Sequence, residues 1–128
     1  MNRKEVVSFR KNIGAGVKEM LKERVKAPGT VEKIRVKFYS GEQLTLKIKP
    51  CVEKKGRQLV DLITYPKNTD TVITGDDELL TFDVVFPVYN DDVLVLIVEN
   101  TGDKLSRCSC DIEVDYYAGD KRVVGGVV

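Results

Sequence analysis

Apolar and polar residues alternate along most of the chain. In the stretch 31–38, apolar side chains take every second position from Ile34 onward, and lysine or arginine takes the positions between. Such alternation predicts a half-buried strand with a solvated outer face. Residues 44–49 alternate in the same way and end at Pro50. The two stretches are therefore expected to pair as an antiparallel hairpin.

The same period continues toward the C-terminus. It predicts further strands at 58–65, 71–74, 80–86, 93–98 and 107–117, and a last short strand at 123–124. Within 107–117 the side chains expected to point inward are Cys108, Cys110, Ile112, Val114 and Tyr116. Turn-forming residues separate the stretches at intervals of roughly 8–12 residues. Around eight short strands spaced in this way predict an all-β fold, an antiparallel β-sandwich or jelly roll, over residues 30–128.

The first 29 residues follow a different pattern. Between positions 13 and 26 the apolar residues recur with helical spacing, and Pro28 with the glycine after it would end a helix, so a short helix is favoured there. A further sandwich strand is the alternative, because the same apolar residues also fit alternation. Residues 1–12 are interpreted as an arm, which makes 1–29 an N-terminal arm and short helix that precedes the sandwich.

The run Val93–Val98 is apolar at every position. Two interpretations stay open. The run is either a central strand that is covered on both faces, or a strand whose outer face is covered by a partner chain.

Composition narrows the chemistry. The chain has 128 residues, a formal net charge of +1 and no histidine. Near-neutral charge argues against a sequence-independent grip on nucleic acid or on an anionic membrane. The lack of histidine excludes Ser-His and Cys-His nucleophilic catalysis and histidine-ligated zinc. No apolar run reaches the roughly 18 residues of a transmembrane helix, and the N-terminus lacks the apolar segment of a secretory signal.

The three cysteines predict no closed disulfide framework, because their number is odd. Cys108 and Cys110 are two residues apart and would share one face of a strand. Small apolar core residues are the favoured interpretation, since a zinc site needs about four ligands and only Cys51 and carboxylates remain to complete one. No metal or other cofactor is expected.

Two acidic turns offer a second kind of chemistry. Asp76 and Asp77 lie in one turn, and Asp91 and Asp92 lie in another. Two such loops at one end of a sandwich could hold calcium through their oxygens. Ordinary turn formation is favoured, because Asp and Asn side chains bond nearby backbone and neither turn has the spacing of a dedicated calcium loop. A carboxylate pair for glycoside hydrolysis would need a cleft that no aromatic cluster marks.

Several turn and strand-end sequences together resemble those of a known family. They run from Ala27-Pro-Gly-Thr through the Gly75-Asp-Asp-Glu and Phe86-Pro-Val stretches to Val98-Glu-Asn-Thr-Gly and Val114-Asp-Tyr-Tyr. Over roughly residues 27–118 the chain resembles small jelly-roll accessory proteins of tailed-phage virions: head decoration, cement and fibre-base proteins, and tail accessory proteins. The resemblance implies binding through surfaces and no catalytic positions. It also implies a virion location after synthesis in the host cytoplasm; a cytoplasmic protein is the alternative.

The leading hypothesis is a non-enzymatic assembly protein that binds a capsid or tail lattice as a homo-oligomer, with a trimer favoured and with no nucleic acid or membrane partner. The expected assembly interface consists of apolar residues from the arm, the run 93–98 and the tail: Val7, Phe9, Leu94, Leu96, Val127 and Val128. A carbohydrate or cell-surface binding module, calcium-assisted through the acidic turns, is the alternative. A small hydrolase that uses carboxylates ranks third.

Overall fold

A computed structural model describes residues 3–41, 45–55, 58–63 and 72–117 of the chain. These residues form eight β-strands, and none of them is helical. The strands are β1 Arg3–Ile13, β2 Lys18–Arg24, β3 Gly29–Phe38, β4 Leu46–Lys54, β5 Gln58–Asp61, β6 Glu78–Val88, β7 Val93–Asn100 and β8 Ser106–Tyr116. The predicted all-β fold of about eight strands is thereby confirmed.

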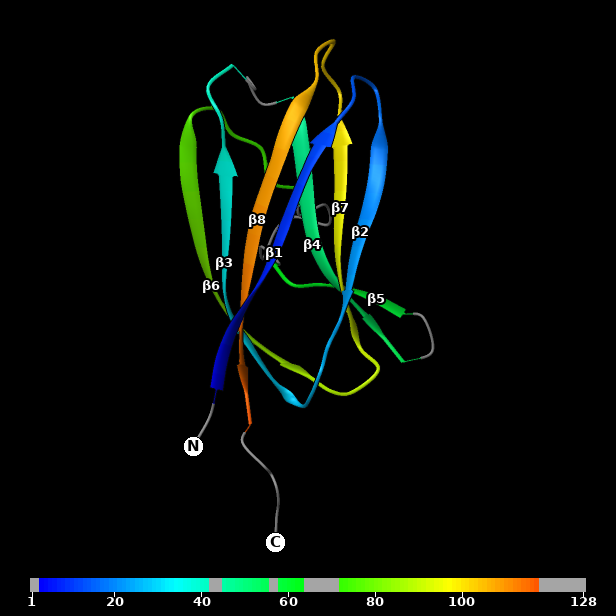
Figure 1. Cartoon of the computed structure of the whole chain (residues 1–128), viewed down its shortest axis with the longest axis vertical. Coiled ribbons are helices and arrows are strands. Elements are labelled where there is room, and N and C mark those ends of the chain that lie inside the picture. Colours follow the sequence, from blue (N-terminus) through cyan, green and yellow to red (C-terminus); the bar gives the residue numbers. More distant parts are fainter. Residues whose placement is uncertain (1–2, 42–44, 56–57, 64–71, 118–128) are drawn as a thin grey trace, which may run out of the picture.

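The strands form two four-stranded antiparallel sheets, with the orders β1-β8-β3-β6 and β2-β7-β4-β5 (Figure 1). The first strand pairs with the eighth, the second with the seventh, the third with the sixth and the fourth with the fifth. The chain is therefore one long antiparallel hairpin rolled up so that successive pairs enter alternate sheets. This is the strand arrangement of a jelly roll.

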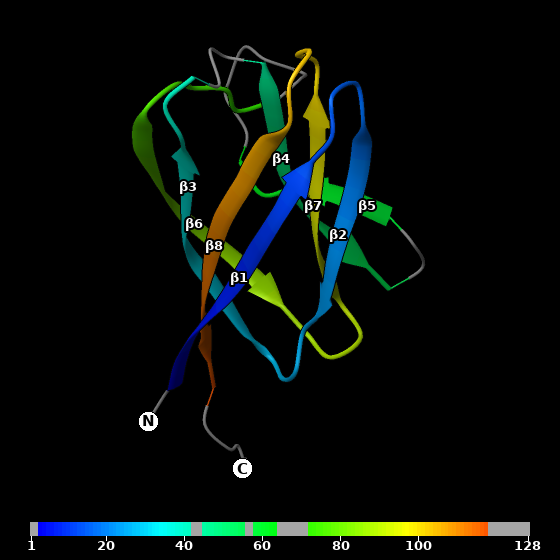
Figure 2. The ribbon, with the colours of Figure 1, turned by 45° about the horizontal axis from the view of Figure 1, so that its top comes forward.

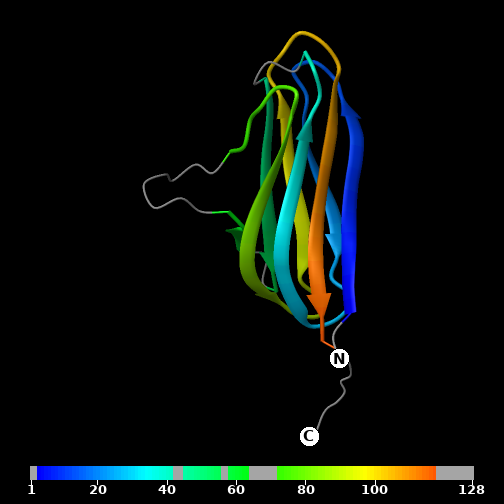
Figure 3. The same ribbon diagram turned by 90° about the vertical axis from the view of Figure 1, so that its left-hand side faces the viewer.

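The core fills the space between the two layers, which Figure 3 shows edge-on. Each layer contributes fully buried side chains: Phe38 and Ile112 come from one sheet, and Leu46 and Leu96 come from the other. Burial of such side chains is the main driving force for folding, at roughly 1.5–3 kcal/mol for each. The inward positions predicted within β8 are all buried, from Cys108 to Tyr116, so the register of this strand is confirmed.

A bulge explains one irregularity of β3. Val31 and Ile34 both point into the core although three positions separate them, and the pairing with both neighbours shifts between Val31 and Lys33. An extra residue in one strand reverses its alternation at that point. The basic residues that follow the bulge still lie on the outer face, as predicted.

The short helix predicted within 13–26 is wrong. Lys18–Arg24 is the strand β2, and it pairs with β7 along its whole length. Leu21 faces the core opposite Leu96, and the charged residues of β2 lie at the sheet edge, where they remain solvated. The residues expected to form an arm also differ: Arg3–Ile13 is β1, which is paired with β8 at every position. Pairing partners roughly a hundred positions away, and not local propensity, select the extended backbone here.

The hairpin predicted between 31–38 and 44–49 is also wrong, because β3 and β4 lie in different sheets. β4 continues through Pro50, although the sequence predicts that the strand ends there. The carbonyl of Pro50 accepts a hydrogen bond from the amide of Leu62 at 3.1 Å, on the β5 side. A residue in an antiparallel strand directs its N–H and C=O to the same side, so the missing N–H of Pro50 faces β5 and the ladder with β7 loses nothing.

The remaining predicted strands fare differently. The stretches 80–86, 93–98 and 107–117 correspond to β6, β7 and β8. Within 58–63, the described part of the stretch 58–65, Gln58–Asp61 is the strand β5. Within 72–74, the described part of 71–74, Ile73 forms an isolated bridge to Ile48. The predicted strand at 123–124 lies outside the described residues. Figure 2 shows the described ends of β1 and β8 side by side at one end of the sandwich, as their pairing requires.

Candidate functional site

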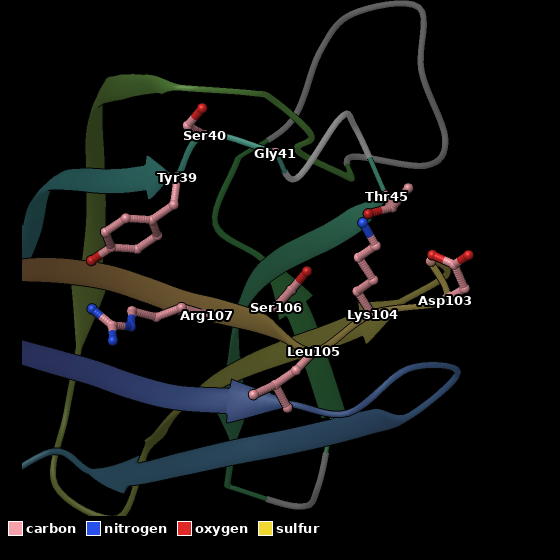
Figure 4. Close-up of a pocket in the computed structure, with 10 residues that line it drawn as sticks. Tyr39, Ser40, Gly41, Thr45, Asp103, Lys104, Leu105, Ser106 and Arg107 are labelled. Atoms are coloured by element: carbon pink, nitrogen blue, oxygen red, sulfur yellow. The ribbon is translucent and has the colours of Figure 1, made fainter.

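A hollow lies at the end of the sandwich where β3 and β7 finish (Figure 4). It has a volume of about 700 Å³ and is lined by the turn 39–41, by Thr45 and by the segment 102–107. Ligand sites on proteins typically have volumes of about 300–1,000 Å³. Its size and its mixed polar lining make this loop-end hollow a candidate site for a small polar ligand.

Cations surround the aromatic residue of the loop-end hollow. The guanidinium carbon of Arg107 lies 5.3 Å from the centre of the Tyr39 ring, and Lys37 Nζ lies 5.3 Å from the same centre. Both distances fall within the range of cation–π attraction. Figure 4 shows Arg107 beside the Tyr39 ring. The Tyr39 ring thus already contacts Lys37 and Arg107 of the same chain. A ligand in the hollow would meet the positive charge of Arg107 rather than a free aromatic face.

A buried amide holds the wall of the loop-end hollow. The Asn100 side chain is fully buried; its Nδ2 donates to the carbonyls of Ile13 (3.0 Å) and Lys104 (2.7 Å). Its Oδ1 accepts from the amide of Gly102 at 2.9 Å. Asn100 therefore fixes the segment 101–105 to the end of β1. The sequence pattern predicts only that Asn100 belongs to a turn. The feature that could have indicated its buried role is its position just after the apolar run 93–98 and directly before Thr-Gly.

A second candidate site is the outer face of the sheet β2-β7-β4-β5. The side chains of β7 alternate between two faces, and those of Val93, Val95 and Ile97 point away from the core. Met20 lies opposite Ile97 on β2, Cys51 lies opposite Val95 on β4, and Leu59 is at the β5 edge. We call the six residues just named the outer stripe. Met20 and Leu59 are 48% and 43% exposed, whereas Val95 is completely buried.

An ion pair covers the centre of the outer stripe. Lys22 on β2 lies opposite Val95, and Glu53 on β4 lies opposite Val93, yet Lys22 Nζ and Glu53 Oε1 are only 3.2 Å apart. The two strands flank β7 at about 4.8 Å on each side, so the two side chains meet above β7. The aliphatic stem of the lysine and the carboxylate together exclude water from Val95.

Two smaller hollows flank Ile97, the part of the outer stripe that this ion pair leaves open. One of about 270 Å³ is lined by Lys18, Lys47, Lys49, Val72, Ile97 and Glu99. The other, of about 480 Å³, is bounded by Lys49, Cys51, residues 58–61 and Ile97. An apolar side chain between two hollows, with lysines at the rim, is the arrangement of an apolar interface centre with a polar rim.

Cys51 contributes packing rather than reactivity. Its Sγ lies 3.5 Å from Asp61 Oδ1, and Lys49 Nζ pairs with the same carboxylate at 3.6 Å. Burial, together with the hydrogen bond and charge of Asp61, raises the pKa of the Cys51 thiol to about 12. Burial likewise raises the pKa of Cys110. All three cysteines are free and buried.

The residues predicted to form an assembly interface are placed largely inside the fold. Phe9, Leu94 and Leu96 are buried in the core, and Val7 is half-buried against it. They offer little or no surface to another molecule while the sandwich is closed. β7 is a central strand between β2 and β4, as the first interpretation of the run 93–98 has it, but its outer face is only partly covered at Val93 and Ile97. Cover by a partner chain, the second interpretation, therefore stays open for that face. Val127 and Val128 lie outside the described residues.

The two acidic turns lie at opposite ends of β6, which separates them by 11 residues, or roughly 35 Å. They cannot share a cation. Asp77 and Asp91 have positive φ values of 48° and 75°, a conformation that Asp tolerates in tight turns. Asp92 is buried and accepts hydrogen bonds from Lys54 Nζ at 2.8 Å and from the Tyr89 amide at 2.9 Å. Turn formation therefore accounts for both segments.

Two further findings concern the described part of the chain. No group of three or more Cys, Asp or Glu side chains gathers there in a way that could hold a metal ion. No helix long and apolar enough to cross a membrane occurs in it.

Comparisons with known proteins found structures with a similar fold but did not identify a family for this chain. No protein-family model and no curated protein sequence matches the chain. A crystal structure of the Yersinia pseudotuberculosis-derived mitogen is similar, with a TM-score of 0.51 and 7% identity over 91% of this chain and 90% of the mitogen. At that identity the likeness shows a shared fold alone, which places the chain among β-sandwich proteins.

Two viral structures are also similar, though more weakly. They are those of the Gx and Gt strains of infectious bursal disease virus, with TM-scores of 0.45 and 0.43 and identities of 17% and 15%. The matches cover 94% and 92% of this chain but only 34% and 33% of the viral chains. The chain thus spans about a third of the length of these viral proteins.

Proposed function

We propose that this protein is a non-enzymatic virion accessory protein that binds a capsid or tail lattice through the outer face of the sheet β2-β7-β4-β5. The supporting observation is that Met20, Ile97 and Leu59 lie on one sheet face. Ile97 lies between two hollows, one of which Leu59 also lines, and lysines stand at their rims. Apolar side chains that stay accessible on a closed sandwich are suited to contact with another protein. The resemblance to tailed-phage accessory proteins supports the same role, with synthesis in the host cytoplasm and a final location in the virion.

The proposal is tested on virions purified from the cells that carry the gene. Immunogold electron microscopy with an antibody against the purified chain is expected to label the head or the tail at regular positions. Chain that is abundant in the cell lysate but absent from intact virions would overturn the proposal.

The docking face is tested with two matched variants. Ile97→Lys is expected to abolish co-sedimentation with virions, because it places a charge between the two hollows. Val6→Lys is the control, since Val6 is 52% exposed on β1 of the other sheet. Both variants should melt close to the parent. Equal virion binding by both variants would reject this face. No observation so far tests the trimer expected from the sequence.

A second candidate function is binding of a carbohydrate or another polar cell-surface ligand in the loop-end hollow. Its volume of about 700 Å³ and the convergence of Ser40, Thr45, Asp103 and Arg107 on it favour this function. A glycan array probed with the parent and with Arg107→Ala tests it. Binding that the substitution removes supports the candidate, and an array without signal rejects it.

A further inference from the structure

Three of the four sheet edges are protected against pairing with another strand. β1 and β2 lie at the same side of the sandwich and are rich in charged residues. Ion pairs link the two sheets at this side, from Lys11 to Glu19 and from Glu5 to Lys26. Lys26 lies just beyond the end of β2. β5 has only four residues. Charge, covering contacts and shortness are the devices by which proteins prevent edge-to-edge association.

The fourth edge, β6, has little of this charge and cover over most of its described length; its one irregularity lies at Val84 and Val85, which together oppose Glu32 of β3. The strand has 11 residues, of which only Glu78 and Asp83 are charged, and Pro87 interrupts it only near its end. In the described part of the chain, β6 pairs with β3 alone. Val85 is 87% exposed and Leu79 is 61% exposed, and both point away from the core. A long apolar edge strand is a template for strand addition.

The inner face of β6 is also incompletely covered. The side chains that β6 directs toward the core, Leu80, Phe82, Val84 and Phe86, are all only partly buried. The inward side chains of the neighbouring strand β3, Ile34 and Val36 among them, are by contrast fully buried, so the core covers β6 less completely than β3. A strand added to β6 would shield apolar side chains on both faces of its sheet.

We propose that β6 pairs antiparallel with β6 of a second copy of this chain, which joins two sheets into one eight-stranded sheet. The inference deepens the proposed assembly role and rests on it for its biological setting. The protein supplies its own matching strand, and two-fold symmetry makes an edge complementary to itself. The isologous pair predicts a dimer in place of the trimer expected from the sequence.

Side-chain chemistry selects one register for this pair. In a two-fold symmetric antiparallel ladder, the residue numbers of every opposing pair add up to the same sum. An inward side chain must lie opposite another inward one, and the inward residues of β6 all have even numbers, so this sum is even. A sum of 164 centres the ladder on Phe82. It sets Leu79 opposite Val85 and Thr81 opposite Asp83, each twice. The two most exposed apolar side chains of the strand then cover each other.

The neighbouring registers are worse. A sum of 166 sets Asp83 directly opposite its own copy, and like charges directly opposite each other are destabilising. A sum of 168 sets Asp83 opposite Val85, and Leu79 then has no opposing residue within the strand. A sum of 162 sets Asp83 beside Leu79.

Charge on the adjacent strand favours the same register. The outer face of β3 carries Lys33 opposite Asp83 and Arg35 opposite Thr81. Lys33 Nζ already lies 3.7 Å from Asp83 Oδ1. With a sum of 164, each Asp83 lies between Lys33 of its own copy and, across Thr81, Arg35 of the second copy. The acidic centre of the new sheet is thus flanked by basic side chains on both sides, which is charge complementarity between the copies.

The first experiment is sedimentation velocity on the purified full chain over a range of concentrations. The parent is expected to approach twice its chain mass of 14.4 kDa. Val85→Lys and Leu79→Lys are each expected to weaken dimerisation at least tenfold, because each places a charge opposite an apolar side chain. Val6→Lys, the same change on the opposite edge strand of the same sheet, is expected to leave it unchanged. Both edge positions are exposed, so folding should persist, and circular dichroism verifies it.

A second experiment tests the register. The native thiols are buried, so an introduced surface cysteine is the reactive one. A mixture of Leu79→Cys chains and Val85→Cys chains, distinguished by a mass tag, is expected to form a disulfide-linked heterodimer under mild oxidation. Val85→Cys alone is expected not to cross-link within the dimer. With a sum of 164 its two copies lie six positions apart, about 20 Å along the ladder, and a disulfide requires Cα atoms within about 7 Å.

The outcomes separate this inference from the proposed function. A parent that is monomeric at all concentrations, a trimer, or a dimer that both lysine substitutions on β6 leave intact would overturn β6 pairing. None of these results bears on binding to virions. Conversely, a dimer with the expected cross-link supports β6 pairing even if the chain is absent from virions.

Discussion

The side chain of Asn100 should contribute more to stability than any other single polar side chain at its end of the sandwich. It makes three hydrogen bonds from a fully buried position, two as donor to Ile13 and Lys104 and one as acceptor from Gly102. Asn100→Ala removes all three bonds and leaves three backbone groups without these partners. At a net value of about 1 kcal/mol for each hydrogen bond, the free energy of unfolding should fall by about 3 kcal/mol.

Two variants show whether the hydrogen bonds cause this loss. Asn12→Ala is the same substitution at an exposed position of β1, and it should change stability by less than about 0.5 kcal/mol. Asn100→Asp keeps an acceptor for Gly102 but loses both donors, and it sets a carboxylate against two carbonyl oxygens. At neutral pH it should be more destabilising than Asn100→Ala, because a buried charge then faces groups of like polarity.

Urea denaturation monitored by circular dichroism measures the effect. With an m value of about 1.5 kcal/mol/M, typical of a small domain, a loss of about 3 kcal/mol lowers the midpoint by about 2 M. An Asn100→Ala variant that unfolds within about 0.3 M of the parent would refute the reasoning, since the three bonds would then contribute nothing beyond what water supplies. An Asn100→Asp variant as stable as the parent would refute the two hydrogen bonds that Asn100 Nδ2 donates to Ile13 and Lys104.

Three further predictions concern burial and ionisation. Ile112→Asp should leave the chain unfolded by circular dichroism, because it places an unpaired charge in the core. Val95→Asp should lower the melting temperature less, because Lys22 lies opposite Val95 on the outer face and offers a cation to the new carboxylate. A parent-like melt of either variant would contradict the register. Cys51 should react with a thiol reagent at pH 8 only after unfolding, and its raised pKa has a defined sign. Its contribution to stability is fully present below about pH 9, where the unfolded thiol is still neutral, and is lost as the pH rises toward 12, so the Cys51→Ala variant should show a shallower alkaline decline than the parent. Asp92→Ala should lower the free energy of unfolding by about 2 kcal/mol in a urea titration, because it removes the partner of Lys54; Lys54→Ala in the same background should then cost little more, and additive losses would show that the two side chains act independently.

Much of the strand content could be predicted because alternation is a local property. In β8 the pattern from Cys108 to Tyr116 fixes both the extended backbone and the face that is buried, and the structure agrees at each inward position. Turns are also a local property, because they need residues that tolerate unusual backbone angles. Asp77 and Asp91, both in predicted turns, have positive φ values that Asp tolerates.

Local pattern failed where two periods fit the same residues. The segment Lys18–Arg24 is mostly charged, and only Leu21 has to face the core, so its sequence is compatible with a helix as well as a strand. Pairing with β7 decides between them, because it satisfies the backbone of both strands. A proline such as Pro50 predicts a strand end, but its missing N–H faces away from β7, and on the β5 side its carbonyl still accepts a hydrogen bond from the amide of Leu62.

The candidate sites show the same division. The run Val93–Val98 was predicted to be covered or to face a partner, but an all-apolar run does not reveal which of its two sets points inward. The opposite sheet decides this by burying Leu94 and Leu96, which leaves Val93 and Ile97 toward the outside. The calcium alternative needs the two acidic turns at one end of the sandwich, whereas β6 holds them at opposite ends.

By itself the sequence determined that the chain forms short, half-buried strands, and which side chains within most of them belong together on one face. That information is carried by residues two positions apart, and each strand contains it in full. Only the tertiary structure decided which strands are neighbours, which edge stays open and which apolar side chains remain outside. Those outcomes depend on pairs such as Phe9 with Cys110, whose contact is set by the packing of the whole sandwich and by no pattern along the chain.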